Sequence, residues 1–215
     1  MRQLKTVQRF ISTAMWGLLA LTLGGCASAL LQQPESATIH TYLLEWQSPV
    51  ATATANPQGP GLLVMPLMAT PGFDTADMAY MRKPHELEYF ARHRWVDSPA
   101  RMLDPLLLRA ATQTGLFSSV VESGSRTVAD LRLDSTLLHL QQVCRLNPSE
   151  QQLAVRVQLV DLKNSRVIAT RTLSVSEPLQ ERTPYAGVIA ANRAVARLLG
   201  QLQEFLAGAV ADVPR

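Results

Sequence analysis

The amino-acid sequence predicts an α/β or α+β fold, in which one mixed β-sheet packs against two main helices in a single compact domain. Short segments that are rich in β-branched and aromatic residues, or that alternate apolar and polar residues, recur along the chain and indicate strands. Two longer segments repeat apolar residues at helical spacing. Because the elements follow in the order β-β-hairpin-α-β-β-β-α, we expect both helices to cover the sheet, whose strand order the pattern leaves open.

The first 25 residues have the organisation of a secretory signal peptide. Residues 1–10 carry three basic side chains and no acidic one, residues 11–23 form an apolar run, and Leu23-Gly24-Gly25-Cys26 follows. The run is shorter than the roughly 20 residues that a helix needs to cross a bilayer. A cysteine directly after small residues resembles a bacterial lipobox, which implies cleavage before Cys26 and lipidation of its sulfur. An ordinary signal peptide with a chance cysteine is the alternative. We therefore divide the chain into a signal peptide at residues 1–25, a lipidated tether at residues 26–37 and a domain at residues 38–215.

Removal of the signal peptide changes the charge and the cysteine chemistry of the chain. The full sequence has 20 basic and 17 acidic residues, and three of the basic residues lie in the leader, so 17 of each sign remain. The net charge of the mature chain therefore gives no support to nucleic-acid binding. With Cys26 lipidated, Cys144 has no intrachain partner. We expect it to pack as a small apolar side chain, and a dimer linked through it stays open.

Strands and a loop are predicted in the first half of the domain. Residues 38–45 have the β-branched and aromatic content of a strand, and residues 48–61 are rich in the residues of loops. Residues 62–67 are an apolar run suited to a strand buried on both faces, which its proline should end. The aromatic-bearing stretches at residues 78–82 and 87–94 are predicted to form a β-hairpin.

A helix follows the hairpin. Ser98 and Pro99 are residue types that favour the N-cap and the first helical position, and Gly115 favours the C-terminal end. Pro105 lies beyond the first turn, and we expect it to kink the helix or to separate that turn. The apolar stripe of this helix consists of Met102, Leu103, Leu106, Leu107, Ala110 and Ala111.

The second half of the domain is predicted to contain four strands and a final helix. Residues 118–122 form a short strand, and residues 130–144 a longer one whose alternation slips between Leu133 and Leu138, which indicates a bulge. Residues 153–159 alternate cleanly, and residues 166–175 return as their hairpin partner. The apolar stripe of the final helix, which we expect to pack on the sheet, consists of Val195, Leu198, Leu199, Leu202, Phe205, Leu206 and Ala209.

Catalytic motifs are not evident. The sequence has no Gly-x-Ser-x-Gly elbow, phosphate loop or dinucleotide fingerprint. His85, Glu86, Glu88 and His93 could converge on a metal if they lie on a hairpin, but they lack the spacing of a helical zinc pair, so solvated hairpin residues are the preferred interpretation. We therefore expect no catalytic residue, no metal and no cofactor.

The segment from Tyr80 to Trp95 mixes aromatic residues with arginines, as the cores of protein interfaces do. The alternative is that Tyr89 and Trp95 cover the sheet. The candidate partner-binding residues are Tyr80, Arg82, Tyr89, Arg94 and Trp95.

These residues also carry a family resemblance. C-terminal to the lipobox, a set of short motifs occurs in the order found in the ABC-type transport auxiliary lipoprotein family, which the chain therefore resembles. This family includes the lipoprotein of the paraquat-inducible intermembrane transport system. The stretch from Tyr80 to Pro99 is the most specific part of this resemblance. The motifs are Tyr42-Leu43-Leu44, Pro71-Gly72-Phe73-Asp74, residues 78–82, residues 87–91 and residues 94–99.

The resemblance implies a non-enzymatic lipoprotein, acylated at Cys26 with palmitate among its acyl groups, on the periplasmic side of the outer membrane. Ala27 in place of aspartate agrees with that sorting. The implied partners are an MCE-domain protein and the ABC transporter subunits of a lipid-transport system, and some members form ring-like homo-oligomers. Two other functions are weighed against this one: a periplasmic lipoprotein that binds a lipid or another amphiphile by itself, and an envelope hydrolase or metal enzyme that uses His85 and His93.

Overall fold

The computed structural model describes residues 38–47 and 53–211, and the described residues from Ile39 onward form a compact unit. The predicted signal peptide, Cys26 and the tether at residues 26–37 lie outside the described residues, as do residues 48–52 of the predicted loop. Within the described ranges, no helix is long and apolar enough to cross a membrane.

The described part of the chain forms a mixed sheet of nine strands with two helices, which confirms the predicted fold class. Strands are present in every segment for which the sequence predicted one, and β3 is an addition. The elements are β1 (His40–Tyr42), β2 (Gly61–Val64), β3 (Met68–Ala69), β4 (Asp77–Met81), β5 (Glu88–Trp95), α2 (Pro99–Gln113), β6 (Ser119–Glu122), β7 (Leu131–Val143), β8 (Glu150–Asp161), β9 (Arg166–Pro178) and α3 (Pro184–Ala211).

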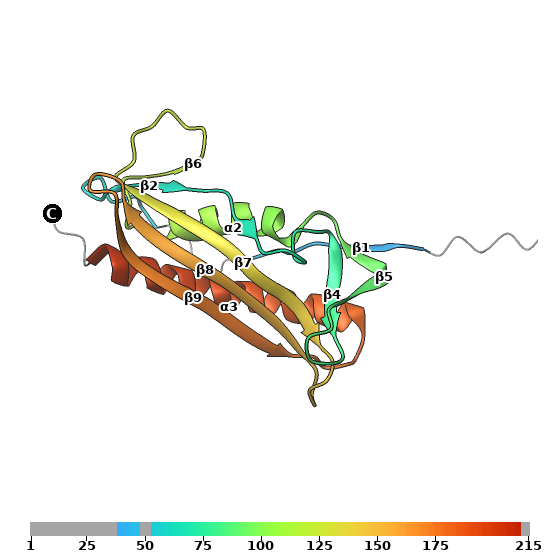
Figure 1. The fold of residues 1–215 in the computed structure, drawn as a ribbon. Coiled ribbons are helices and arrows are strands. Elements are labelled where there is room, and N and C mark those ends of the chain that lie inside the picture. The colour runs from blue at the N-terminus through green and yellow to red at the C-terminus, as the bar shows by residue number, and fades with distance from the viewer. Residues whose placement is uncertain (1–37, 48–52, 212–215) are drawn as a thin grey trace, which may run out of the picture. The chain divides into compact units, whose positions relative to one another are not determined.

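Strand β7 organises the sheet. It pairs antiparallel with β8 along its length, and β8 pairs antiparallel with β9. In parallel it pairs with three successive segments, namely β2 near its start, β3 in its middle and β4 at its end. Strand β6 extends the sheet from β2, whereas β5 and then β1 extend it from β4 (Figure 1). Strands β2 and β6 therefore flank the start of β7, whereas β4, β5 and β1 flank its end. The predicted hairpin β4–β5 thus lies at the same end of β7 as β1.

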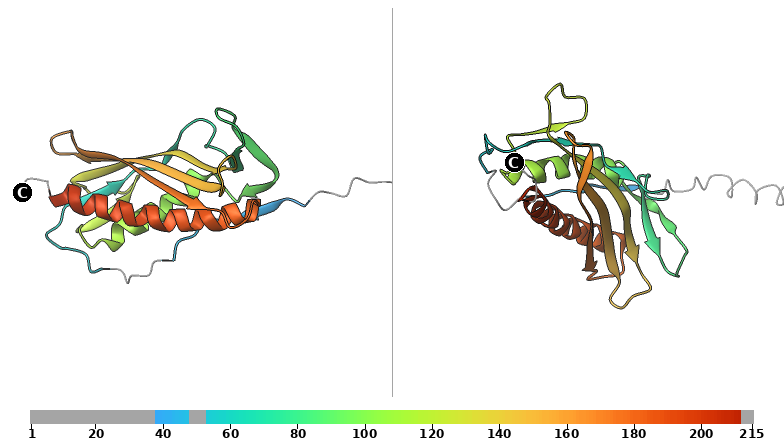
Figure 2. Two further views of the ribbon diagram at one scale, coloured as in Figure 1. Left: turned by 90° about the horizontal axis from the view of Figure 1, so that it is seen from below. Right: turned by 60° about the vertical axis from the view of Figure 1, so that its left-hand side comes forward.

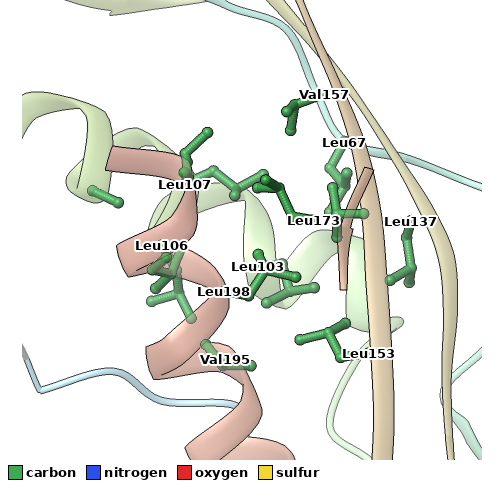
Figure 3. Packing of buried hydrophobic residues seen from close by; sticks show 14 of the residues in the cluster. Leu67, Leu103, Leu106, Leu107, Leu137, Leu153, Val157, Leu173, Val195 and Leu198 are labelled. Carbon is green, nitrogen blue, oxygen red and sulfur yellow. The ribbon is translucent and has the colours of Figure 1, made fainter. Parts of the chain in front are cut away.

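Both helices cover one face of the sheet (Figures 1 and 2). Leucine and valine residues from this face and from the two helices interlock in a single core (Figure 3). Their close packing is the main stabilising contribution to the domain, because the hydrophobic effect grows with the apolar area that is removed from water. Core residues labelled in Figure 3 include Leu103, Leu107, Leu137, Leu153, Leu173, Val195 and Leu198.

The bulge predicted in the long strand is present in β7. The register between β7 and β8 shifts between Leu137 and His139. Leu131, Leu133 and Leu137 are buried before this point, and Leu140 is buried after it. The extra residue thus changes which positions of the strand face the helices, as the slip in the sequence indicated.

Helix α2 begins with Ser98 and Pro99 as predicted, and Gly115 follows its end with a φ of 65°. The expectation that Pro105 separates the first turn is wrong, because the helix runs without interruption across this residue. Pro105 is exposed, and so is Arg101, whose carbonyl loses its helical donor. Water can solvate that carbonyl, which lowers the penalty of an internal proline.

The chain that leaves β1 is fixed to the core by two side chains. Leu44 and Trp46 are 6% and 8% exposed. The guanidinium of Arg109, on α2, lies over the Trp46 ring at 4.9 Å and donates to the Trp46 carbonyl. The short strand β1 is therefore followed at once by a well-anchored segment.

Candidate partner-binding surface

The β4–β5 hairpin brings Tyr80 and Arg82 together around Glu88. The Tyr80 hydroxyl donates to Glu88 Oε2 at 2.9 Å, and Arg82 Nε donates to Glu88 Oε1 at 2.8 Å, with Arg82 Nη2 bound to Oε2. The guanidinium also lies 5.6 Å from the centroid of the Tyr80 ring. These hydrogen bonds from Arg82 lower the pKa of Glu88, and donation to Glu88 raises the pKa of Tyr80. The Arg82–Glu88 ion pair thus orients the ring of Tyr80.

An aromatic row continues from Tyr80 toward β1 and α3. The ring of Phe90 lies 4.4 Å from that of Tyr80 and 6.2 Å from that of His93. Tyr42 Oη and His93 Nδ1 are hydrogen-bonded at 2.9 Å, and the ring of Tyr42 lies 6.0 Å from that of Tyr185. The row therefore joins three strands and the start of a helix.

Partial burial favours the neutral form of His93 in this row. Burial lowers the pKa of His93, and the nearby charges of His40 and Arg92 lower it further. The rings of His40 and His93 stack at 5.0 Å. A neutral His93 is consistent with its place between other rings.

Tyr89 and Arg94 do not join this row. Tyr89 stands between Glu88 and Phe90 in the strand and points to the other face, where its hydroxyl donates to the Gly72 carbonyl at 2.9 Å. Arg94 Nη2 lies 3.3 Å from Asp77 Oδ1. The side chain of Arg94 is 47% exposed, so this ion pair is weak.

Trp95 lies in the core, with only 3% of its surface exposed. It ends β5, where it pairs with Tyr42 of β1, and it joins the main apolar cluster. A contact between Trp95 and a partner is therefore not available in the folded domain. For this residue the alternative interpretation applies, in which the ring covers the sheet, because the neighbouring strand and the core enclose it.

The sequence did not indicate that Phe90, His93, Tyr42 and Tyr185 would meet. Phe90 and His93 share a face because the β4–β5 register shifts between the pairs at Asp77 and Ala79. Such a bulge lets residues three apart point the same way. Tyr185 is distant in sequence from these residues and comes close only through the tertiary fold.

A metal centre on the hairpin does not form in the described residues, where no three His, Cys, Asp or Glu side chains gather. His85 is exposed in the turn with a φ of 65°, and His93 is bound to Tyr42. Cys144 is half-buried, and burial raises the pKa of its thiol. A raised pKa keeps the thiol protonated, which makes it a poor nucleophile.

A cleft of about 340 Å³ lies elsewhere, between the end of β2, helix α2 and the end of β6. Arg101, Asp104 and Glu122 contribute charged groups to its walls. Asp104 Oδ1 accepts a hydrogen bond from the Leu67 amide at 2.7 Å, and burial raises the pKa of this carboxyl. Charged walls do not favour an acyl chain, because a buried charge must be paired or hydrogen-bonded. The cleft therefore gives no support to an independent lipid-binding function.

Comparison with known proteins identifies the family. The family model described as ABC-type transport auxiliary lipoprotein component matches residues 42–203. The chain belongs to this family. The match covers most of the domain, including every residue of the β4–β5 hairpin, so it confirms the resemblance on which the prediction rested. No curated protein matches the chain.

Solved structures show that the auxiliary lipoprotein fold recurs at low identity. Protein XCC0632 from Xanthomonas campestris is 20% identical, with a TM-score of 0.65 over 79% of this chain and 95% of that one. Hypothetical protein CT253 from Chlamydia trachomatis is 12% identical, with a TM-score of 0.50 over 72% of this chain and 100% of that one. These likenesses concern the fold alone.

Proposed function

We propose that this auxiliary lipoprotein is a non-catalytic docking subunit of an MCE-type intermembrane lipid-transport system. In this proposal Cys26 carries the lipid anchor, and the domain stands on the periplasmic side of the outer membrane. The observation that carries the proposal is the family match over residues 42–203, together with the lipobox that precedes it. Its partners are an MCE-domain protein and the ABC transporter subunits of the same system.

A tethered adaptor is physically suited to this task. A lipid anchor confines the domain to one membrane and raises its effective concentration near a partner that must dock there. Several acyl chains hold a protein at a membrane far longer than one chain does. The work of transport would come from the ATP-driven subunits, so the adaptor needs only a binding surface.

The β4–β5 hairpin supplies that surface in this proposal. Arg82 is 64% exposed and Tyr89 is 40% exposed, so both side chains can contact a partner from opposite faces of the hairpin. Tyr80 is held by Glu88 and Arg94 lies beside Asp77. Arginine and tyrosine are enriched among residues that dominate binding energy, because each combines apolar area with hydrogen-bond donors.

Co-purification of the full chain from detergent-solubilised envelope tests the proposal. We expect MCE-domain and ABC transporter subunits to co-purify with the wild-type protein, and Arg82→Glu or Tyr89→Ala to reduce their recovery. Arg156→Glu is a matched control, because Arg156 is exposed on β8, away from the hairpin. Recovery of no such subunits by the wild-type chain would refute the docking function. Equal loss in the control would refute only the assignment of the surface. Light scattering on the same sample measures whether copies associate with one another.

A further inference from the structure

Large apolar side chains that remain exposed are concentrated at one place in the described domain. Among the described residues, five of the nine such side chains lie on or beside β1 and the first turns of α3, with exposed fractions between 43% and 59%. Monomeric proteins expose scattered apolar side chains, whereas a contiguous group marks a contact surface. We name this group the β1 patch: Ile39, Leu43, Val96, Tyr185 and Ile189.

Hydrogen bonds join the segments that form the β1 patch. Asn192 Nδ2 donates to the Leu43 carbonyl at 3.2 Å, and its Oδ1 accepts from the Glu45 amide at 2.6 Å. The Val96 amide donates to the Tyr42 carbonyl at 2.8 Å. On α3, Tyr185 and Ile189 are one turn apart and lie on the same side of the helix as Asn192. The three segments that carry the patch are therefore held together in the folded domain, although its residues come from three regions of the sequence.

The polar atoms beside the patch suit the interface of a bilayer. The rings of Tyr42 and Tyr185 lie 6.0 Å apart, and each carries a hydroxyl on an apolar ring. Tyrosine prefers the boundary between apolar and aqueous regions for this reason. The Arg94 charge on the neighbouring strand lies beside Asp77, so it adds little net charge to this end.

The length of chain before Ile39 determines what this end of the domain meets. Ile39 is the thirteenth residue after Cys26. Even fully extended, a segment of that length spans only about 45 Å. If Cys26 carries lipid, as the proposed function requires, the end of the domain that holds β1 stays within this distance of the bilayer.

We infer that the β1 patch contacts the phospholipid surface to which the chain is anchored. Ile39, Leu43 and Ile189 enter the interfacial region, and the Tyr185 hydroxyl remains at the level of the headgroups. The opposite end of the sheet, where β9 begins, then faces away from the membrane. This inference rests on the proposed lipid anchor and adds to it a fixed orientation of the domain.

Site-specific fluorescence on the lipidated full chain tests the inference. A Cys144→Ser background leaves one reactive thiol in each variant, since an acylated Cys26 sulfur does not react. Tyr185→Cys and Ile189→Cys place an environment-sensitive dye in the patch. Val167→Cys is the matched control, because Val167 is 48% exposed and lies on β9 near the opposite end of the sheet. The proteins are reconstituted in vesicles of phosphatidylethanolamine and phosphatidylglycerol that contain lipids with a quencher in the acyl chain.

The expected result is a blue-shifted dye at positions 185 and 189, quenched several-fold more strongly than the dye at position 167. Equal quenching at all three positions would overturn the inference and leave the anchor in place. A dye at position 185 that is already shielded without vesicles would also overturn it, because the chain itself or a second copy would then cover the patch. Mass spectrometry of the same sample reports acylation. A chain without acyl groups at Cys26 would refute the anchor as well as the inference.

Discussion

Glycines in helix α3 give a direct test of how closely this helix packs on the sheet. A Cβ atom at Gly187 would lie 2.6 Å from Gln142 Oε1 and 3.4 Å from Gln151 Oε1. Gln142 and Gln151 are 2% and 3% exposed and pair across β7 and β8, so neither side chain can swing into solvent. At Gly200, in the same helix, a Cβ atom would meet nothing within 4 Å. The same substitution should therefore have opposite effects at the two positions.

Helix propensity and steric overpacking compete at these glycines, and the larger of the two decides whether alanine raises or lowers the free energy of unfolding. Replacing a glycine with alanine inside a helix stabilises it by about 1 kcal/mol. At Gly200 this gain is unopposed, and we expect Gly200→Ala to raise the free energy of unfolding by about 1 kcal/mol. At Gly187 the added methyl group overpacks a closed site, which costs about 1–3 kcal/mol. Gly187→Ala should therefore lower the free energy of unfolding by about 1 kcal/mol after the helix gain is subtracted.

Thermal unfolding of the chain without its signal peptide and Cys26, followed by circular dichroism, measures both effects. For a domain of this size 1 kcal/mol corresponds to roughly 2–4 °C, so the two midpoints should differ by roughly 4–8 °C. A Gln142→Ala background removes the atom that clashes, and Gly187→Ala should then become neutral or stabilising. A rise in midpoint for Gly187→Ala that equals the rise for Gly200→Ala would show that the helix does not approach the sheet this closely.

Three further predictions concern single residues. Trp95→Ala should lower the free energy of unfolding by about 3–5 kcal/mol, because it leaves a cavity in the core. Arg94→Glu should change the free energy of unfolding by less than about 1 kcal/mol. Equal values for the two variants in urea titrations would contradict the burial of Trp95. Glu177 is 7% exposed and is bound by Arg193 and Arg197, at 3.1 and 2.6 Å. Burial alone would raise the pKa of Glu177, but hydrogen bonds from Arg197 and Arg193 outweigh it and leave this pKa low. Glu177→Gln should therefore lower the free energy of unfolding by about 1 kcal/mol, a modest loss because both arginines also reach water. The loss should shrink as pH falls through the folded-state pKa of Glu177. Urea titrations of both proteins that show the same difference at neutral and acidic pH would refute this. Burial lowers the pKa of His139 from 6.5, so the folded chain binds fewer protons than the unfolded chain and stability falls as pH drops below 6.5. His139→Gln should reduce that dependence of the urea midpoint on pH, and an unchanged slope would exclude His139 as its source.

Local sequence was sufficient for most of the fold. The β4–β5 hairpin and the start of α2 depend on turn residues, caps and short-range periodicity, which act within a few residues of one another. The bulge in β7 was predictable for the same reason, because it changes the apolar pattern of one strand. The start of α3 was missed, since its buried side is made of small residues such as Gly187, Ala190 and Ala191, which give a weak apolar stripe.

The candidate site was predictable only where its residues are close in sequence. Tyr80, Arg82 and Glu88 face one another across a hairpin, so cross-strand pairing alone could have linked them. Trp95 was harder to place, because its neighbour Arg94 is exposed and the strand pattern allows either face. Its burial depends on Tyr42 of β1, which pairs beside it, and therefore on a contact that only the folded sheet creates.

The order in which the chain leaves the sheet has a mechanical consequence. If Cys26 is anchored, tension between the membrane and a bound partner enters the domain at Ile39. The first element that it loads is β1, a three-residue strand at the margin of the sheet, while Leu44 and Trp46 resist behind it. Detachment of the three residues of β1 would lengthen the segment between the anchor and the core by roughly 10 Å without unfolding the core. Under such tension the domain would yield first at this short strand, while its core stays folded.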